Sequence, residues 1–172
     1  MKQWKMYVLS YIWGFLFVAQ IILVFIFGIV NENRIDVVMY IGVAIWWFAV
    51  ILAWLPIFIL KRKGEVPNGK SFVYTTVIVE SGLYSVIRHP QYMAGILFSF
   101  SLILISQNWV IAAMSVVIIT LSYIDILNAD KHEVEKFGDA YKDYMEKVPR
   151  INFLLGIIKL LRRRKKTAGN WP

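Results

Sequence analysis

Cysteine is absent from this chain of 172 residues, and histidine occurs at only two positions, His89 and His132. The absence of cysteine excludes disulfide bonds, thiolate metal ligands and cysteine nucleophiles, and it leaves no thiol from which a redox compartment could be inferred. Two imidazoles are too few for a histidine-rich metal site. The sequence therefore predicts no metal centre.

Charged residues are also scarce. They make up 17% of the chain, whereas hydrophobic residues make up 59% and aromatic residues 16%. A soluble domain of this size needs a charged exterior, while a protein solvated by lipid can turn apolar side chains outward. The composition excludes a disordered chain and indicates an integral membrane protein.

Two runs without a charged residue, 7–30 and 37–60, each contain 24 residues and exceed the roughly 20 that cross a bilayer. A cleaved signal peptide is the alternative for the first run, but the run is too long and no small-residue cleavage site follows it. A third apolar region, 93–127, is too long for one span and suits a tight hairpin of two short spans, with the polar triplet 106–108 at its tip. The predicted fold is all-α and polytopic, with about four transmembrane helices followed by cytoplasmic C-terminal helices.

Basic residues are distributed unevenly among the connections. Of the 19 Lys and Arg residues, all but Arg34 lie before the first span, between the second and third, or after the fourth. The positive-inside rule places both termini and segment 61–92 in the cytoplasm. Nucleic-acid binding is the competing explanation, but no nucleic-acid-binding motif accompanies these residues and most aromatic residues lie in the apolar runs. We therefore expect membrane lipids, and no nucleic acid, as partners.

Pro90 suits the first turn of a helix, because it has no backbone N–H to donate there. The third span should therefore begin at His89 or Pro90, which places Arg88 and His89 at a helix N-terminus. Free backbone N–H groups and the helix dipole could receive an anionic group of a ligand at this end. The alternative is that both residues only mark the lipid headgroup boundary. Asp125, the one charged residue within the spans, is either functional or simply hydrogen-bonded.

The segment 129–150 has alternating charges and a helical pattern. Five of its residues recur at steps of three or four: Asp130, Val134, Phe137, Tyr141 and Tyr144. They would share one helix face if Gly138 permits a continuous helix. Turned toward Arg88 and His89, this face would form a lid with enough polar groups for a cofactor.

Three motifs together resemble the superfamily of isoprenylcysteine carboxyl methyltransferases and phospholipid methyltransferases, which are integral membrane enzymes. The motifs are Gly82-Leu83-Tyr84, then Arg88-His89-Pro90-x-Tyr92, and finally Phe137-Gly138-x-x-Tyr141-x-x-Tyr144 followed by Val148-Pro149-Arg150. Their order and the intervening hairpin also match, and the resemblance covers residues 81–150.

This resemblance implies methyl transfer from S-adenosylmethionine, bound on the cytoplasmic side. The residues that it implicates in cofactor binding lie in the motifs or on the segment after the last span: Tyr84, Arg88, His89, Pro90, Tyr92, Asp130, Glu133, Tyr141 and Tyr144. Family members commonly carry two acidic residues eight and seven positions before the Phe-Gly phenylalanine. Here these positions hold Ala129 and Asp130, so one carboxylate is missing, and Glu133, one turn later, is the candidate substitute.

The acceptor of the methyl group stays open between two chemistries. Methyl transfer from a sulfonium is an in-line displacement that needs an aligned nucleophile more than a strong acid or base. A prenylcysteine-type carboxylate is already ionised, and Arg88 or Arg150 could orient it bidentately. A lipid amine must first lose a proton, which favours Glu133, Asp130 or His132 as the base.

We expect a lipophilic acceptor that enters from the bilayer, because the motif adjoins the first turn of the third span. A soluble acceptor that docks on the loop 61–70 is the alternative. Two other functions also stay open: a membrane reductase relative that uses a nicotinamide cofactor, and a catalytically silent membrane interaction protein, which the missing carboxylate at position 129 keeps in consideration.

The C-terminal segment 151–172 contains an apolar stretch too short to span a bilayer, followed by the five cations Arg162 to Lys166. This pattern predicts an interfacial helix held by anionic lipid, with disorder in the last ten residues. The chain thus divides into two N-terminal spans (1–60), a loop with the start of the cofactor motif (61–92), a hairpin (93–127), a helical lid (128–150), and an interfacial helix with a basic tail (151–172).

Overall fold

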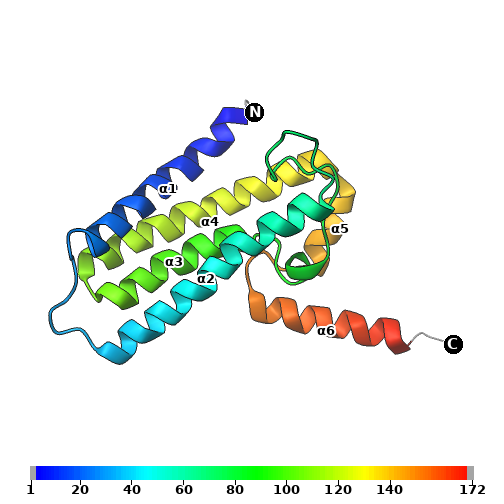
Figure 1. Cartoon of the computed structure of the whole chain (residues 1–172). Helices are drawn as coiled ribbons and strands as arrows, with labels where there is room; N and C mark the ends of the chain where they lie inside the picture. Colours follow the sequence, from blue (N-terminus) through cyan, green and yellow to red (C-terminus); the bar gives the residue numbers. More distant parts are fainter. Residues whose placement is uncertain (1–2, 170–172) are drawn as a thin grey trace. The chain divides into compact units, whose positions relative to one another are not determined.

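The computed structural model describes residues 3–169, which form six α-helices and one short 3-10 helix and contain no strand (Figure 1). The helices are α1 (Gln3–Phe25), α2 (Asp36–Lys63), η1 (Gly82–Ser85), α3 (Pro90–Ser106), α4 (Trp109–Phe137), α5 (Asp139–Lys147) and α6 (Phe153–Gly169). The predicted all-α membrane fold is confirmed. Helix α3 begins at Pro90, as the proline predicts.

Among the described residues, three helices are long and apolar enough to cross a membrane: Val8–Phe25 of α1, α2 and α4. The fourth, α3, has 17 residues and is a shorter apolar helix. Helix α4 is longer than the sequence suggests, because it continues without a break past residue 127 to Phe137. Helix α2 likewise runs through Pro56 without ending.

The chain forms two compact units. Unit 1 comprises Met1–Ala53 and Tyr92–Asp130, and unit 2 comprises Trp54–Gln91 and Lys131–Pro172. Unit 1 therefore contains α1, most of α2 and α3, and the larger part of α4. Unit 2 contains the end of α2, the loop with η1, the last turns of α4, and helices α5 and α6.

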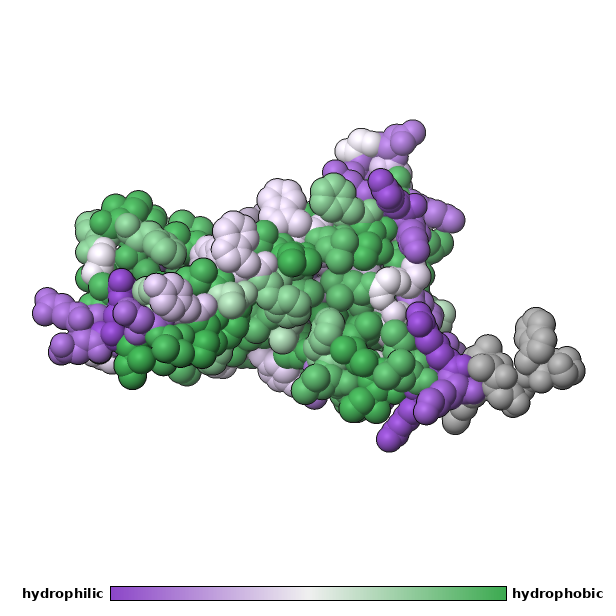
Figure 2. All heavy atoms as spheres, turned by 60° about the horizontal axis from the view of Figure 1, so that its bottom comes forward, coloured by the Kyte–Doolittle hydropathy of each residue, from purple (hydrophilic) through white to green (hydrophobic). Residues whose placement is uncertain are grey.

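Apolar side chains inside unit 1 bring its helices together. Val24, Leu102, Ile105 and Ile111 form a buried core, with partly buried aromatic residues packed against it. Gly42 lets α2 approach α3 closely, because a Cβ atom there would lie 2.9 Å from the Cβ of Leu104. Large apolar side chains also cover the exterior, as the green surface in Figure 2 shows, which suits a bundle solvated by lipid.

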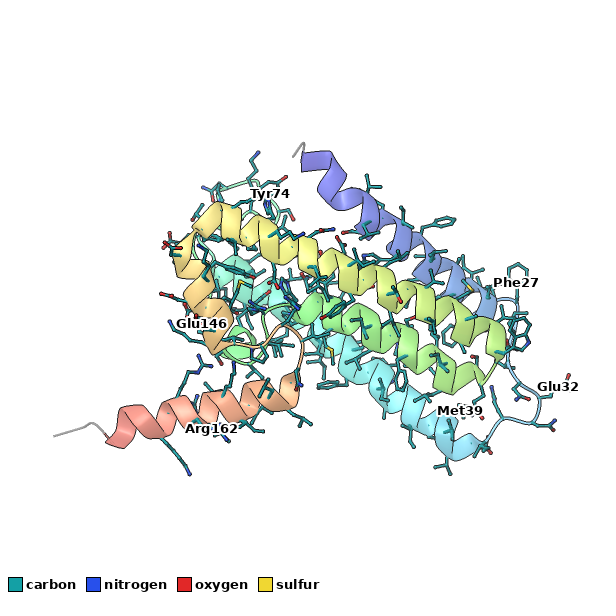
Figure 3. All side chains as sticks on the ribbon, turned by 180° about the vertical axis from the view of Figure 1, so that it is seen from behind. Phe27, Glu32, Met39, Tyr74, Glu146 and Arg162 are labelled. Carbon is teal, nitrogen blue, oxygen red and sulfur yellow. The ribbon has the colours of Figure 1, made fainter. Side chains whose placement is uncertain are left out.

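The tip of the hairpin between α3 and α4 is fixed by its polar residues. Asn108 accepts a hydrogen bond from the N–H of Val110 at 2.9 Å and so caps the start of α4. The Gln107 side chain bonds both the N–H and the carbonyl oxygen of Ile35, each at 2.8 Å. The tight hairpin and its polar tip at 106–108 are thus found where the sequence predicts them. Phe27, Glu32 and Met39, labelled in Figure 3, mark the connection between α1 and α2 and the start of α2 in the same unit.

Buried polar side chains connect α1 with α3 and α4 inside unit 1. The amide of Gln20 donates to Ser115 Oγ at 2.5 Å and accepts from Ser99 Oγ at 3.0 Å, and all three side chains are fully buried. Asp125 accepts hydrogen bonds from Ser10 and, at 3.0 Å, from the indole Nε1 of Trp13. The hydrogen-bonded alternative for Asp125 is the one that the structure shows.

Candidate active site

The segment that carries Arg88 and His89 is held in unit 2 by backbone hydrogen bonds. The N–H of Arg88 donates to the carbonyl oxygen of Pro149, and that of His89 donates to the carbonyl oxygen of Arg150, both at 3.1 Å. The motifs at 88–90 and 148–150, which are 60 residues apart in the sequence, therefore lie side by side. Arg88 and His89 are both buried, with 7% and 8% of their surface exposed.

Three tyrosines gather beside this segment in unit 2. Tyr144 donates its hydroxyl hydrogen to the carbonyl oxygen of Tyr84 at 2.6 Å. The rings of Tyr141 and Tyr144 meet edge to face with their centroids 5.6 Å apart. Tyr141 and Tyr144 also form a buried cluster with Val148, which is fully buried. Helix α5 is thereby fixed against η1, and the tyrosines line the same region as Arg88.

Electrostatic effects identify the charged groups that face these tyrosines. Burial raises the pKa of Tyr84, and the negative charge of Glu133 raises it further. Burial also raises the pKa of Tyr144, with smaller contributions from Tyr141, Tyr84 and Glu80, while the positive charge of Arg88 lowers it. The charges of Glu133 and Arg88 therefore shift pKa values within one tyrosine cluster. The phenols of Tyr84 and Tyr144 stay protonated at neutral pH.

Two of the predicted cofactor residues belong to unit 1. Tyr92 stacks at a tilt on Trp13, with ring centroids 6.1 Å apart, and Asp130 is buried at the end of the unit 1 part of α4. The other predicted residues belong to unit 2, where Tyr84, Arg88, His89, Glu133, Tyr141, Tyr144 and Arg150 are brought together and Pro90 begins α3. Within unit 2, Glu133, His132 and Arg150 are partly buried.

Gly138 interrupts the helix that the periodicity of 129–150 suggests. Its φ of 62° lies in the left-handed region that glycine adopts at no steric cost, so α4 ends at Phe137 and α5 begins at Asp139. A continuous helix with one face from Asp130 to Tyr144 is therefore wrong. The turn allows α5 to pack its tyrosines on η1, which a straight continuation of α4 need not do.

Two contacts of α6 with residues 85–86 are not evident from the sequence. Gly156 approaches Val86 so closely that an added Cβ atom would lie 2.8 Å from the Val86 carbonyl carbon and would overlap its oxygen. Arg163 Nη2 donates to the carbonyl oxygen of Ser85 at 2.8 Å. The single glycine in the apolar stretch of α6 was the one indication of this close approach. Nothing in the sequence indicated that the charge of Glu80 raises the pKa of Tyr144.

The structure also corrects the expected disorder at residues 163–172. Helix α6 continues to Gly169, because Lys and Arg are good helix formers and Arg163 is bonded to the η1 segment. Residues 170–172 lie outside the described part of the chain. Among the residues that the structure describes, no group of three His, Asp or Glu side chains could hold a metal ion.

Apolar spanning helices together with a buried cluster of Arg, His, Tyr and Glu define a polytopic membrane protein with a polar site of its own. The phospholipid methyltransferase family matches residues 37–140, more than half of the chain, and the chain belongs to this family. It is therefore a membrane methyltransferase. The match includes α2 and the Arg88-His89 segment but ends just before Tyr141. No curated protein and no solved structure gives a significant match.

Proposed function

We propose that this chain transfers a methyl group from S-adenosylmethionine to a lipophilic acceptor in the membrane. One observation carries the proposal. The buried Arg88-His89 segment, which lies within the part that matches the family, is hydrogen-bonded through its backbone to Pro149 and Arg150 and lies beside the tyrosine cluster on which the charge of Glu133 acts. Methyltransferases of this family generally use S-adenosylmethionine, which supplies the methyl group when it is bound.

The side chains of unit 2 suit the chemistry of this cofactor. The guanidinium of Arg88 matches the cofactor's carboxylate, and the carboxylate of Glu133 matches its ammonium group. The buried rings of Tyr141 and Tyr144 pack on each other and hold α5 against η1, so their part in the proposed site is to position the segment beside Arg88. Glu133 also supplies the carboxylate that position 129 lacks. Tyr92 and Asp130, which belong to unit 1, stay predictions from the sequence.

The acceptor's head group is expected near Arg150 and Glu133, which serve the two open chemistries. Arg150 orients a carboxylate, whereas Glu133 accepts the proton that an amine must lose. His89 directly precedes α3, a helix of apolar character that starts at Pro90. A lipophilic acceptor gains roughly 0.8 kcal/mol for each methylene that stays in hydrocarbon while its head group reaches this position.

The distribution of basic residues supports a cytoplasmic site. With both termini and the loop 61–92 in the cytoplasm, α2 delivers the chain to that side and α3 leaves from it, so Arg88 and His89 have access to a soluble cytoplasmic cofactor.

The cofactor site is tested by calorimetric titration of the detergent-purified protein with S-adenosylhomocysteine. Arg88→Ala and His89→Ala should each weaken binding at least tenfold, or about 1.4 kcal/mol, if each side chain makes one charged or polar contact. Lys142→Ala, which removes an exposed cation from α5, is the matched control and should bind normally. Unchanged affinity in both site variants, with the fold intact, would refute the site. Binding of a nicotinamide cofactor instead would favour the reductase alternative.

The acceptor is tested on the same preparation with radioactive methyl donor. Acceptors that share one head group, amine or carboxylate, should be methylated faster as their acyl chains lengthen. Equal transfer to short, soluble members would show that the acceptor comes from water.

A further inference from the structure

Helix α6 has two different faces, and only one of them contacts the rest of unit 2. Gly156, Lys159 and Arg163 follow each other at steps of three and four, so they share a face. This face contacts the protein through Val86, through the carbonyl oxygen of Glu146, which Lys159 reaches at 2.8 Å, and through that of Ser85. Glu146 lies on α5 and Arg162 on α6 in Figure 3.

The opposite face is apolar, exposed and bordered by cations. Leu154, Ile158 and Leu161 have 75%, 47% and 54% of their surface exposed. They recur at steps of four and three, and an α-helix turns by about 100° per residue, so they lie opposite the contact face. Arg162, Arg164 and Lys165 are exposed along the same turns. Figure 2 shows this apolar patch next to the hydrophilic residues that precede the C-terminal end.

The start of α6 lies close to the start of a membrane helix. Asn152 caps α6 by accepting a hydrogen bond from the N–H of Leu155 at 3.0 Å. Two residues earlier, the carbonyl oxygen of Arg150 accepts from the N–H of His89, which directly precedes the first residue of α3. The segment that leads into α6 is therefore bonded, within unit 2, to the residue that precedes α3.

We propose that this face of α6 binds the surface of an anionic lipid bilayer. Its apolar residues would enter the headgroup boundary while Arg162, Arg164 and Lys165 pair with lipid phosphates. No acidic residue occurs after Glu146, so the charge of the whole segment is complementary to an anionic surface. The same face of a second copy would bring like charges together, which opposes its pairing with itself. Lipid binding by α6 is independent of methyl transfer.

The absence of native cysteine allows a direct test. Ile158→Cys, in the full chain, is labelled with a nitrobenzoxadiazole fluorophore and reconstituted into vesicles of phosphatidylcholine alone or mixed with phosphatidylglycerol. In the anionic vesicles the emission should shift to the blue and be quenched by lipids with brominated acyl chains. Asp139→Cys, whose native side chain is 91% exposed on α5, is the control and should stay accessible to aqueous iodide in both.

The contribution of charge is tested in the labelled Ile158→Cys background with Arg162→Gln, Arg164→Gln and Lys165→Gln combined. Each cation near the surface changes partition about fivefold, so the triple variant should lose most of the preference for anionic vesicles. Arg163 and Lys159, which bond α6 to the rest of unit 2, are left intact.

Three outcomes would overturn the proposal. The first is emission typical of water from position 158 in both kinds of vesicle, and the second is a lipid contact that stays the same in the triple variant. The third is an apolar environment that is lost when the protein is diluted in lipid, which would mean that a second copy covers the face. Because none of these measurements requires cofactor or acceptor, they remain distinct from a failure of the methyltransferase assignment.

Discussion

Polar side chains are buried in both units, but they have different kinds of partner. In unit 1, Gln20, Ser99 and Ser115 bond one another, and Asp125 is bonded by Ser10 and Trp13. In unit 2, the Tyr144 hydroxyl bonds the backbone of Tyr84, and the backbone N–H groups of Arg88 and His89 bond the carbonyl oxygens of Pro149 and Arg150.

The bonds between side chains in unit 1 are those expected of a bundle solvated by lipid. In hydrocarbon no water can satisfy a polar group, so polar side chains of a spanning bundle must find partners within it and act as connections between helices. In unit 2 a loop of irregular backbone, η1 and a short amphipathic helix hold ionisable groups beside a cluster of aromatic rings. We therefore interpret the polar residues of unit 1 as structural, whereas a functional role for those of unit 2 belongs to the proposed function.

The largest expected effect tests how unit 2 is held together. Gly156→Ala places a Cβ atom against the backbone of Val86, so α6 must move away, and the free energy of unfolding should fall by about 2–3 kcal/mol. Trypsin should then cleave faster at the cations of α6. The matched control is Gly14→Ala, since a Cβ atom at Gly14 meets nothing within 4 Å. Equal stability of both variants would show that α6 is not packed on η1.

A smaller effect is expected from the buried carboxylate of unit 1. Asp125→Ala leaves Ser10 and the Trp13 indole without their common acceptor, which should destabilise the bundle by about 1–2 kcal/mol in denaturation by sodium dodecyl sulfate. Asp125→Asn retains an acceptor oxygen and should cost less. Affinity for S-adenosylhomocysteine should not change in either variant. If it falls while stability is retained, Asp125 belongs to the active site and the contrast between the units fails.

The smallest effect concerns the tyrosines of unit 2 at high pH. Because the pKa values of Tyr84 and Tyr144 are raised in the folded protein, their contribution is complete below the ordinary tyrosine pKa of about 10 and declines as the pH rises above it. Tyr144→Phe removes one hydrogen bond, worth about 1 kcal/mol at neutral pH, and should reduce the loss of stability above pH 10 by about half.

Thermal unfolding measured between pH 8 and about 11.5 checks this expectation. Tyr74→Phe, in the exposed part of the loop before η1, is the control for loss of a tyrosine outside the cluster. An identical decline in the Tyr144→Phe and native proteins would mean that Tyr144 titrates in water and is not part of the buried cluster.

The sequence by itself determined the membrane class, the apolar helices and the hairpin. Long runs without charge are stable in lipid as helices. The polar triplet 106–108 within such a run can lie only at the tip of the hairpin. Pro90 determined where α3 starts, since its ring and its missing N–H fit only the first turn. The motifs around Arg88 and Tyr144 were sufficient to predict the family, because they depend on residue identity and order.

Only the tertiary structure decided how the motifs meet. The backbone pairing of 88–89 with 149–150 involves no side chain, so no residue type reveals it. Gly138 could have continued the helix or ended it, and the packing of Tyr144 on Tyr84 decided between them. The contact face of α6 is set by the approach of Gly156 to Val86, a distance between backbones that periodicity cannot supply. Periodicity describes one helix at a time, whereas these contacts depend on which helix becomes its neighbour.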